Sequence, residues 1–280
     1  MHGVNIERAG RVTPIAELCG GEARRFSEPP KVAVVVGTFA AVPYVHLHLE
    51  ARRRFYPEVP LLVHDDGSPK AAELAALCRD YGADFERNTP RLPPCKGDLC
   101  AFAGGLAWAG ENGAGLLVKM SRRFVPLGRW VDGLVALAEE SDYATYNAWT
   151  TSFNFGFRTE CLALAVEEWS GMAGEIVGAI HAPGSPFVEA FMHGLARRAA
   201  ARNTVASRAY DRRVGARTVE RNGYAIWPFL GTDRCAPSAE YLWHDWAGPK
   251  DYAALAERWG LAWRERDFAD PNMGFGAQPS

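Results

Sequence analysis

Long apolar runs are absent from this sequence. The longest, such as the one at 32–36, are far shorter than the roughly 20 residues that a membrane-spanning helix needs, so no membrane span is predicted. The first 25 residues carry several charges and no sustained apolar core, unlike a secretory signal. We therefore expect a soluble protein in the cytoplasm.

Net charge is also low, with 31 Lys and Arg against 33 Asp and Glu. This balance gives no reason to expect a nucleic-acid partner or a membrane-surface binder. Any basic site must therefore be local.

Cysteine is sparse, and the six cysteines follow neither a disulfide framework nor a zinc-site spacing. Cys95 and Cys100 are the only close pair, and no other Cys or His pair has matching spacing. We expect free thiols and no metal site built from them.

Strand and helix patterns alternate through the first half of the chain. The β-branched run at 31–37 is typical of a strand buried on both faces, as in a parallel sheet. The order predicts an α/β fold of one domain, with a mostly parallel central sheet flanked by helices. The expected strands are 31–37, 60–64, 83–87, 115–121 and 143–147, and the expected helices are 43–55, 69–82, 98–109 and 127–140, with Asp98 as an N-cap.

The second half is less regular. It is expected to hold a segment at 153–158, then a helix that runs through Glu168, a Gly/Pro loop at 182–186 and a helix over 187–202. An irregular half after a regular sheet is where we expect a second substrate to be recognised.

The segment 61–69 is the most informative, because an apolar strand ends in Asp65 and Asp66 and then turns through Gly, Ser and Pro. Open α/β folds bind ligands at the carboxyl ends of their strands, which places a candidate site here. Asp, Gly and Ser also favour turns for local reasons, so a plain turn is the alternative interpretation.

This turn, the strand that ends in Gly37-Thr38-Phe39, the helix at Gly97-Asp98 and the apolar strand at 115–121 together resemble the nucleotide-binding half of GT-A glycosyltransferases. The resemblance covers about 31–170 and is closest to family 2. It implies a nucleotide-diphosphate sugar, such as a UDP-sugar, as the donor. The implied donor-binding residues are Thr38 and Phe39 for the base, Asp65 or Asp66 for hydroxyls or the base edge, and Asp98.

The resemblance fails where the family has an Asp-x-Asp metal motif, because 118–123 contains no carboxylate. Mg²⁺ and Mn²⁺ favour carboxylate oxygens, so either metal is possible here but not predicted. Our hypothesis is that one or more of Lys119, Arg122 and Arg123 neutralise the diphosphate directly. The alternative is that Arg122 and Arg123 are solvated residues at a strand exit.

Four residues of the second half are candidates by the same resemblance. Asn154 and Gly156 match a segment that lines the donor-sugar pocket, although Gly156 also fits a strand bulge. Glu189 stands where inverting members present a catalytic base, although acids are common in first helical turns. His244 stands where a late histidine reaches the diphosphate, although its Trp-rich surroundings also fit a tail anchored on the core.

The resemblance implies a glycosyltransferase that moves a sugar to an acceptor hydroxyl, on a saccharide or small molecule, without a required cofactor. A GT-A-like module that binds partners without catalysis is the alternative. A nucleotidyltransferase is less favoured, because only Gly37 represents its Gly-rich phosphate loop. The implied parts are an extension at 1–30, the nucleotide-sugar half at 31–150, the acceptor and catalytic half at 151–246, and a helix with a tail at 247–280.

Overall fold

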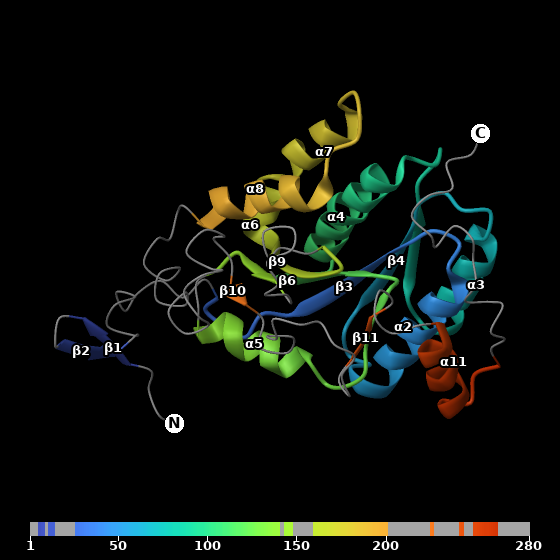
Figure 1. Cartoon of the computed structure of the whole chain (residues 1–280), viewed down its shortest axis with the longest axis horizontal. Coiled ribbons are helices and arrows are strands. Elements are labelled where there is room, and N and C mark those ends of the chain that lie inside the picture. Colours follow the sequence, from blue (N-terminus) through green and yellow to red (C-terminus); the bar gives the residue numbers. More distant parts are fainter. Residues whose placement is uncertain are drawn as a thin grey trace.

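The protein is an α/β structure in which helices cover both faces of one central sheet (Figure 1). The computed structural model describes residues 5–8, 11–14, 26–140, 143–147, 159–200, 225–226, 241–243 and 249–262.

The central sheet has seven strands, and all neighbours are parallel except β9, which is antiparallel to both of its neighbours. The predicted α/β fold with a mostly parallel, helix-flanked sheet is thereby confirmed. Across the sheet the order is β10 (Ala225–Ile226), β8 (Thr145–Asn147), β9 (Cys161–Ala165), β6 (Leu116–Ser121), β3 (Val32–Thr38), β4 (Leu61–Asp65) and β5 (Asp84–Arg87).

Two small antiparallel sheets stand beside the central one. The first pairs β1 (Asn5–Arg8) with β2 (Arg11–Pro14), and the second pairs β7 (Phe124–Pro126) with β11 (Tyr241–Trp243). Because β7 directly follows β6, the second small sheet adjoins the carboxyl edge of the central sheet.

The helices form two layers (Figure 1). On one side of the sheet lie α4 (Pro94–Glu111), α6 (Val166–Ser170), α7 (Ala173–His181) and α8 (Val188–Ala200). On the other side lie α2 (Val42–Phe55), α3 (Ala71–Asp80), α5 (Val131–Glu140) and α11 (Pro249–Arg258). Among the described residues, no helix is both long and apolar enough to cross a membrane.

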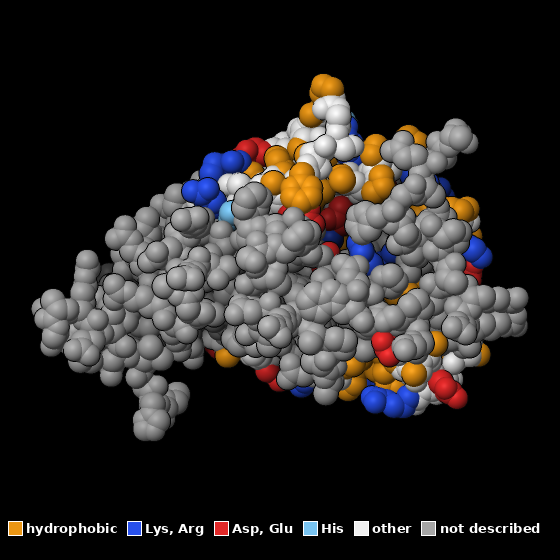
Figure 2. Space-filling view, in the orientation of Figure 1, with side chains coloured by type: hydrophobic (Ala, Val, Ile, Leu, Met, Phe, Trp, Pro, Cys, Tyr) orange, Lys and Arg blue, Asp and Glu red, His pale blue; other side chains and the backbone are white. Residues whose placement is uncertain are grey.

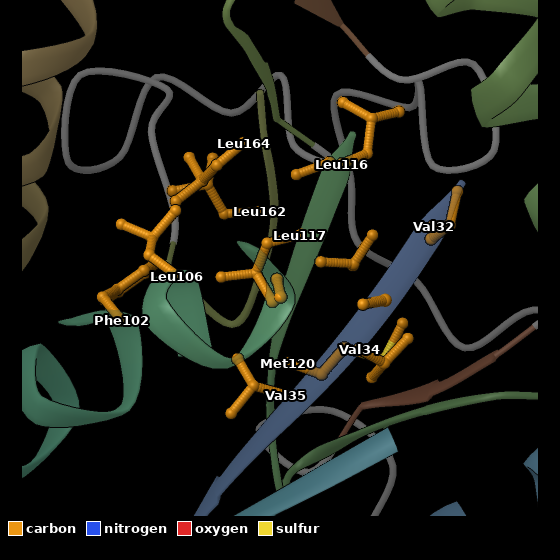
Figure 3. Packing of buried hydrophobic residues seen from close by; sticks show 14 of the residues in the cluster. Val32, Val34, Val35, Phe102, Leu106, Leu116, Leu117, Met120, Leu162 and Leu164 are labelled. Carbon is orange, nitrogen blue, oxygen red and sulfur yellow. The ribbon is translucent and has the colours of Figure 1, made fainter. Parts of the chain in front are cut away.

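The core is packed around β3 and β6, whose apolar residues are buried on both faces. Side chains alternate along a strand, and Val35 and Leu117 face α4, where they meet Phe102 and Leu106 (Figure 3). Helices on both sides explain why the β3 sequence is a continuous apolar run instead of an alternating one.

The chain reverses its direction across the sheet at β3. It runs outward from β3 to β4 and β5, and α4 then carries it back to β6 on the other side of β3. The carboxyl ends of β3 and β6 therefore form the point of reversal, which is where open α/β sheets bind ligands.

Two local predictions were wrong. The segment Cys161–Ala165, which was expected to be helical, is the strand β9 beside β6; a five-residue apolar run has no periodicity that separates the two states. Asp98 does not cap α4, because the helix begins earlier, at Pro94, and proline is tolerated in a first helical turn. β7 and α7 were not predicted.

Close contact between α4 and the sheet requires Gly105. A Cβ atom there would lie 2.7 Å from Val35 Cγ1 and 3.2 Å from Leu117 Cδ2, whereas one on Gly110 of the same helix would meet only Val166 at 3.8 Å.

We expect Gly105→Ala to lower the free energy of unfolding by about 1–3 kcal/mol, because the core has no room for the methyl group. Gly110→Ala should leave stability unchanged or raise it by up to about 1 kcal/mol through better helix propensity. Urea denaturation of both variants measures the difference, and equal effects would show that α4 does not need its close approach.

Candidate functional site

Thr38 and Asp65 lie side by side at the carboxyl edge of the sheet. They are register partners at the ends of β3 and β4, with exposed fractions of 7% and 0%. Asp65 Oδ2 accepts a hydrogen bond from the Ser68 amide at 2.9 Å. Asp65 Oδ1 and Thr38 Oγ1 have no hydrogen-bond partner within the described part of the chain. Because unpaired buried oxygens are costly, we take these two atoms as the centre of the candidate site.

Asp66 points the other way, toward α4. Its Oδ1 accepts hydrogen bonds from Asn88 Nδ2 at 2.9 Å and from the Leu92 amide at 3.4 Å. Its carboxylate fills the space that a side chain on Gly97 would need. Burial raises the pKa of Asp66, and the two hydrogen bonds oppose that rise. Asp66 thus joins the turn to the loop before α4.

The turn itself is fixed by Gly67, whose φ of +69° is in the left-handed region. A Cβ atom there would lie 2.9 Å from the Asn88 carbonyl oxygen and 3.0 Å from the Arg91 backbone. Only glycine combines this φ with so little space. The Asp-Asp-Gly-Ser segment is a turn, as its composition predicts. Its first carboxylate brings to the sheet edge, beside Thr38, an oxygen that no described residue bonds.

Phe39 follows Thr38 and is half-buried. The Arg91 guanidinium lies over its ring, 3.7 Å from the centroid, in cation–π geometry. Ala40 comes next with φ of 55°, which is uncommon for a residue with a side chain and marks strained backbone beside the candidate site.

Lys119 is buried in the centre of the sheet, with an exposed fraction of 1%. Its ammonium donates to Asp98 of α4 and to the Thr159 carbonyl oxygen, the latter at 3.0 Å, and lies 4.9 Å from the centroid of the Phe102 ring. The side chain of Asp98 is 29% exposed. A diphosphate that used Lys119 would have to compete with this ion pair.

The turn at 121–123 lies at the point of chain reversal. The Arg122 amide donates to the Gly37 carbonyl oxygen at 3.3 Å, and Arg122 Nη1 donates to the Phe39 carbonyl oxygen at 2.7 Å. The Arg123 amide donates to Ser121 Oγ at 3.1 Å. Arg122 therefore connects the end of β6 to the strained end of β3. On the face of the molecule that Figure 2 draws, acidic and basic side chains lie close together in a hollow.

Glu189 lies in the first turn of α8, near the start of α4. Burial, then the nearby carboxylates of Asp98 and Glu189, raise the pKa of the Cys95 thiol. Lys96 donates to the Ala182 carbonyl oxygen at 2.6 Å, so the loop before α8 is attached to α4. Glu189 and Asp98 therefore both lie close to Cys95. Asn154, Gly156 and His244 lie outside the described residues.

His48 and Tyr252 contact the 121–123 turn, and sequence reasoning missed both. His48 Nε2 lies 3.2 Å from the Ser121 carbonyl oxygen, and Tyr252 OH donates to the Arg123 carbonyl oxygen at 2.6 Å. Burial lowers the pKa of His48 to about 4, although its backbone hydrogen bonds oppose this. No sequence signal distinguishes either residue, because both contacts join distant parts of the chain.

Possible metal ligands are dispersed. In the stretches that the structure describes, no group of three or more His, Cys, Asp and Glu side chains is arranged to hold a metal ion. Within the same stretches, Cys78, Cys95, Cys100 and Cys161 are free thiols.

Solved glycosyltransferase structures are similar to this chain at low identity. S. aureus TarS in complex with UDP is 10% identical over 51% of this chain and 48% of its own, with a TM-score of 0.41. Mannosyltransferase PcManGT from Pyrobaculum calidifontis, in complex with GDP-Man and Mn²⁺, is 16% identical to this chain. The match covers 87% of this chain and 79% of the mannosyltransferase, with a TM-score of 0.39. Glucosyl-3-phosphoglycerate synthase from Mycobacterium tuberculosis is 15% identical to this chain. The match covers 58% of this chain and 64% of the synthase, with a TM-score of 0.39.

This chain covers only 29% of another, longer TarS structure. No family model and no curated protein matches the sequence. At these identities and TM-scores, the likenesses say nothing about a shared substrate or reaction.

The buried Lys119–Asp98 pair predicts a large stability effect. We expect Asp98→Ala to lower the free energy of unfolding by about 2–4 kcal/mol, because it leaves a buried ammonium without its carboxylate. Adding Lys119→Met should recover most of the loss. Glu73→Ala, which breaks the exposed Lys70–Glu73 pair, should cost less than about 1 kcal/mol. Urea denaturation measures all four proteins, and a double variant no more stable than Asp98→Ala would contradict the expectation.

His48 predicts a pH dependence of stability. Its pKa is about 4 in the folded protein against 6.5 in an unfolded chain, so the unfolded state binds the proton first as pH falls. The stability that neutral His48 contributes is fully present above about pH 6.5. It is lost progressively as pH falls from there through about 4, and the total loss in free energy of unfolding is about 3 kcal/mol. Denaturation at stepped pH should show this excess loss relative to His48→Gln, and parallel curves would contradict it.

Proposed function

We propose that this protein is a glycosyltransferase that uses a nucleotide-diphosphate sugar as its donor. The single observation that carries the proposal is the pair of buried oxygens on Thr38 and Asp65, which have no hydrogen-bond partner among the described residues and lie next to a basic turn at the point of chain reversal. The sequence resemblance to GT-A enzymes supports it.

The nucleoside is the first part of the donor to place. Asp65 Oδ1 is an acceptor suited to a ribose hydroxyl or a base N–H group, and Thr38 Oγ1 can both donate and accept. The Phe39 ring, already covered on one face by Arg91, offers an apolar surface to a base. These three side chains form the proposed nucleoside-binding group.

The diphosphate is the second part. Where a metal-binding motif would supply carboxylates, the chain has Ser121, Arg122 and Arg123. Guanidinium groups bind phosphate oxygens well, and a fixed cation stabilises the negative charge that develops on a leaving diphosphate. We assign this role to the turn, and to Arg123 before Lys119, because Arg123 lies at the sheet edge and is half-buried, whereas the Lys119 ammonium is buried inside the sheet.

In the transfer step, the acceptor hydroxyl oxygen forms a bond to the anomeric carbon of the sugar. The bond from that carbon to the diphosphate oxygen breaks, the nucleoside diphosphate leaves with the bonding electron pair, and the hydroxyl proton passes to a base. Glu189 remains our candidate base, because it lies in the first turn of α8 and, like Asp98, close to Cys95 at the start of α4. Holding the two substrates in line is the rest of the protein's contribution.

Calorimetry with UDP, GDP and dTDP tests the proposal, in EDTA and in Mn²⁺. We expect one of them to bind in EDTA, and Asp65→Asn to weaken that binding at least about tenfold, because the amide keeps an acceptor for Ser68 but loses the unpaired carboxylate oxygen. Asp80→Asn, an exposed acid on α3, should bind like the wild type.

Turnover of a matching nucleotide-sugar in EDTA would establish the reaction. Strict dependence on Mn²⁺ would overturn the role of the basic turn. Binding without turnover would favour the non-catalytic module instead. No binding of any nucleotide under either condition would overturn the proposed function.

A further inference from the structure

The backbone of the turn at 121–123 is held from three separate elements. The Ser121 carbonyl oxygen lies by His48 of α2, the Arg122 amide donates to the end of β3, and the Arg123 carbonyl oxygen accepts from Tyr252 of α11. Every residue of the turn therefore has at least one backbone group fixed by a partner distant in sequence.

His48 is suited to a fixed, neutral contact. It is completely buried, and a carbonyl acceptor requires the proton on Nε2. Nδ1 then faces inward without a hydrogen bond from any described residue. A second proton on Nδ1 would create a buried charge without a partner, which agrees with a pKa of about 4. His48 thus donates one hydrogen bond at neutral pH and carries no charge toward the turn.

Tyr252 brings the C-terminal helix to the same turn. Its ring packs against Tyr44 of α2 with centroids 4.9 Å apart, and its hydroxyl reaches the Arg123 carbonyl oxygen. The ring and the hydroxyl therefore have separate roles, one in packing and one at the turn. The cluster that joins α11 to α2 and β7 is Ala41, Tyr44, Leu47, Ala51, Val125, Tyr252, Leu255, Ala256 and Trp259.

We propose that His48 and Tyr252 are positioning residues that hold the 121–123 turn in the conformation that presents Arg123 to the donor diphosphate. The inference rests on the proposed function and adds two residues to it. Its physical basis is preorganisation: a cation that is already in place stabilises a leaving group without reorganising, and a loose one does not. Arg122 is anchored separately, through the Gly37 and Phe39 carbonyl oxygens.

The test compares a nucleoside diphosphate with its own nucleoside, for example UDP with uridine, using whichever of UDP, GDP and dTDP binds the wild type. The ratio of the two affinities isolates the diphosphate contribution. We expect Tyr252→Phe and His48→Leu each to lower this ratio by about three- to tenfold, as for the loss of one hydrogen bond. Nucleoside affinity should stay within about twofold of wild type.

Two further variants serve as controls. His48→Gln keeps an N–H donor at comparable reach, so it should retain the wild-type ratio. Tyr81→Phe deletes a hydroxyl that bonds Glu50 on the same helix as His48, away from the turn, and should change nothing. Calorimetry for the diphosphate and ligand-observed NMR titration for the nucleoside supply the affinities.

An unchanged ratio in Tyr252→Phe, which keeps the ring packing and so the fold, would overturn the inference even if His48→Leu does not fold. A parallel loss of nucleoside and diphosphate affinity would overturn it too, because that is the result of general loosening. A wild-type protein that binds no nucleoside diphosphate overturns the proposed function itself. Wild-type binding with an unchanged ratio overturns only the role of the two positioning residues.

Discussion

The close approach of α4 to the sheet is the constraint on which the rest of the structure depends. Gly105 removes the side chain that would separate the helix from Val35, and Gly97 makes room for the Asp66 carboxylate. Because α4 also returns the chain from β5 to β6, its position determines where the sheet reverses. A helix held further away would leave Asp98 unable to reach Lys119 and would separate the turn after β4 from its support.

Neighbouring acids serve opposite purposes because a strand alternates its side chains. Asp66 faces α4 and accepts hydrogen bonds from Asn88 and Leu92. Asp65 faces the other way, and one of its oxygens, beside Thr38, has no hydrogen-bond partner in the part of the chain that the structure describes. The basic residues are divided in a similar way. Lys119 is inside the sheet and neutralised by Asp98, while Arg122 and Arg123 stand at its edge. Their positions therefore differ in burial more than in residue type.

In the proposed function, the cations of a turn take the place of a metal site, which changes what the surrounding structure must provide. A metal ion orients its ligands by coordination, whereas a guanidinium on a long side chain depends on the backbone that carries it. The contacts from α2, β3 and α11 to the 121–123 turn supply that restraint here. In our proposal, α11 therefore belongs to the site as much as the strands do.

The sequence by itself determined the α/β architecture and the position of the Asp-Asp-Gly-Ser turn, because apolar runs, glycines and carboxylates act locally or with a simple period. It did not determine that Cys161–Ala165 is a strand, since such a short run takes its state from an available neighbour, here β6. Only the tertiary structure decided that Lys119 is paired and that His48 and Tyr252 reach the basic turn. It also decided that Asp65, and not Asp66, has an oxygen without a partner among the described residues. Each of those outcomes depends on contacts between residues far apart in the chain, which no local pattern records.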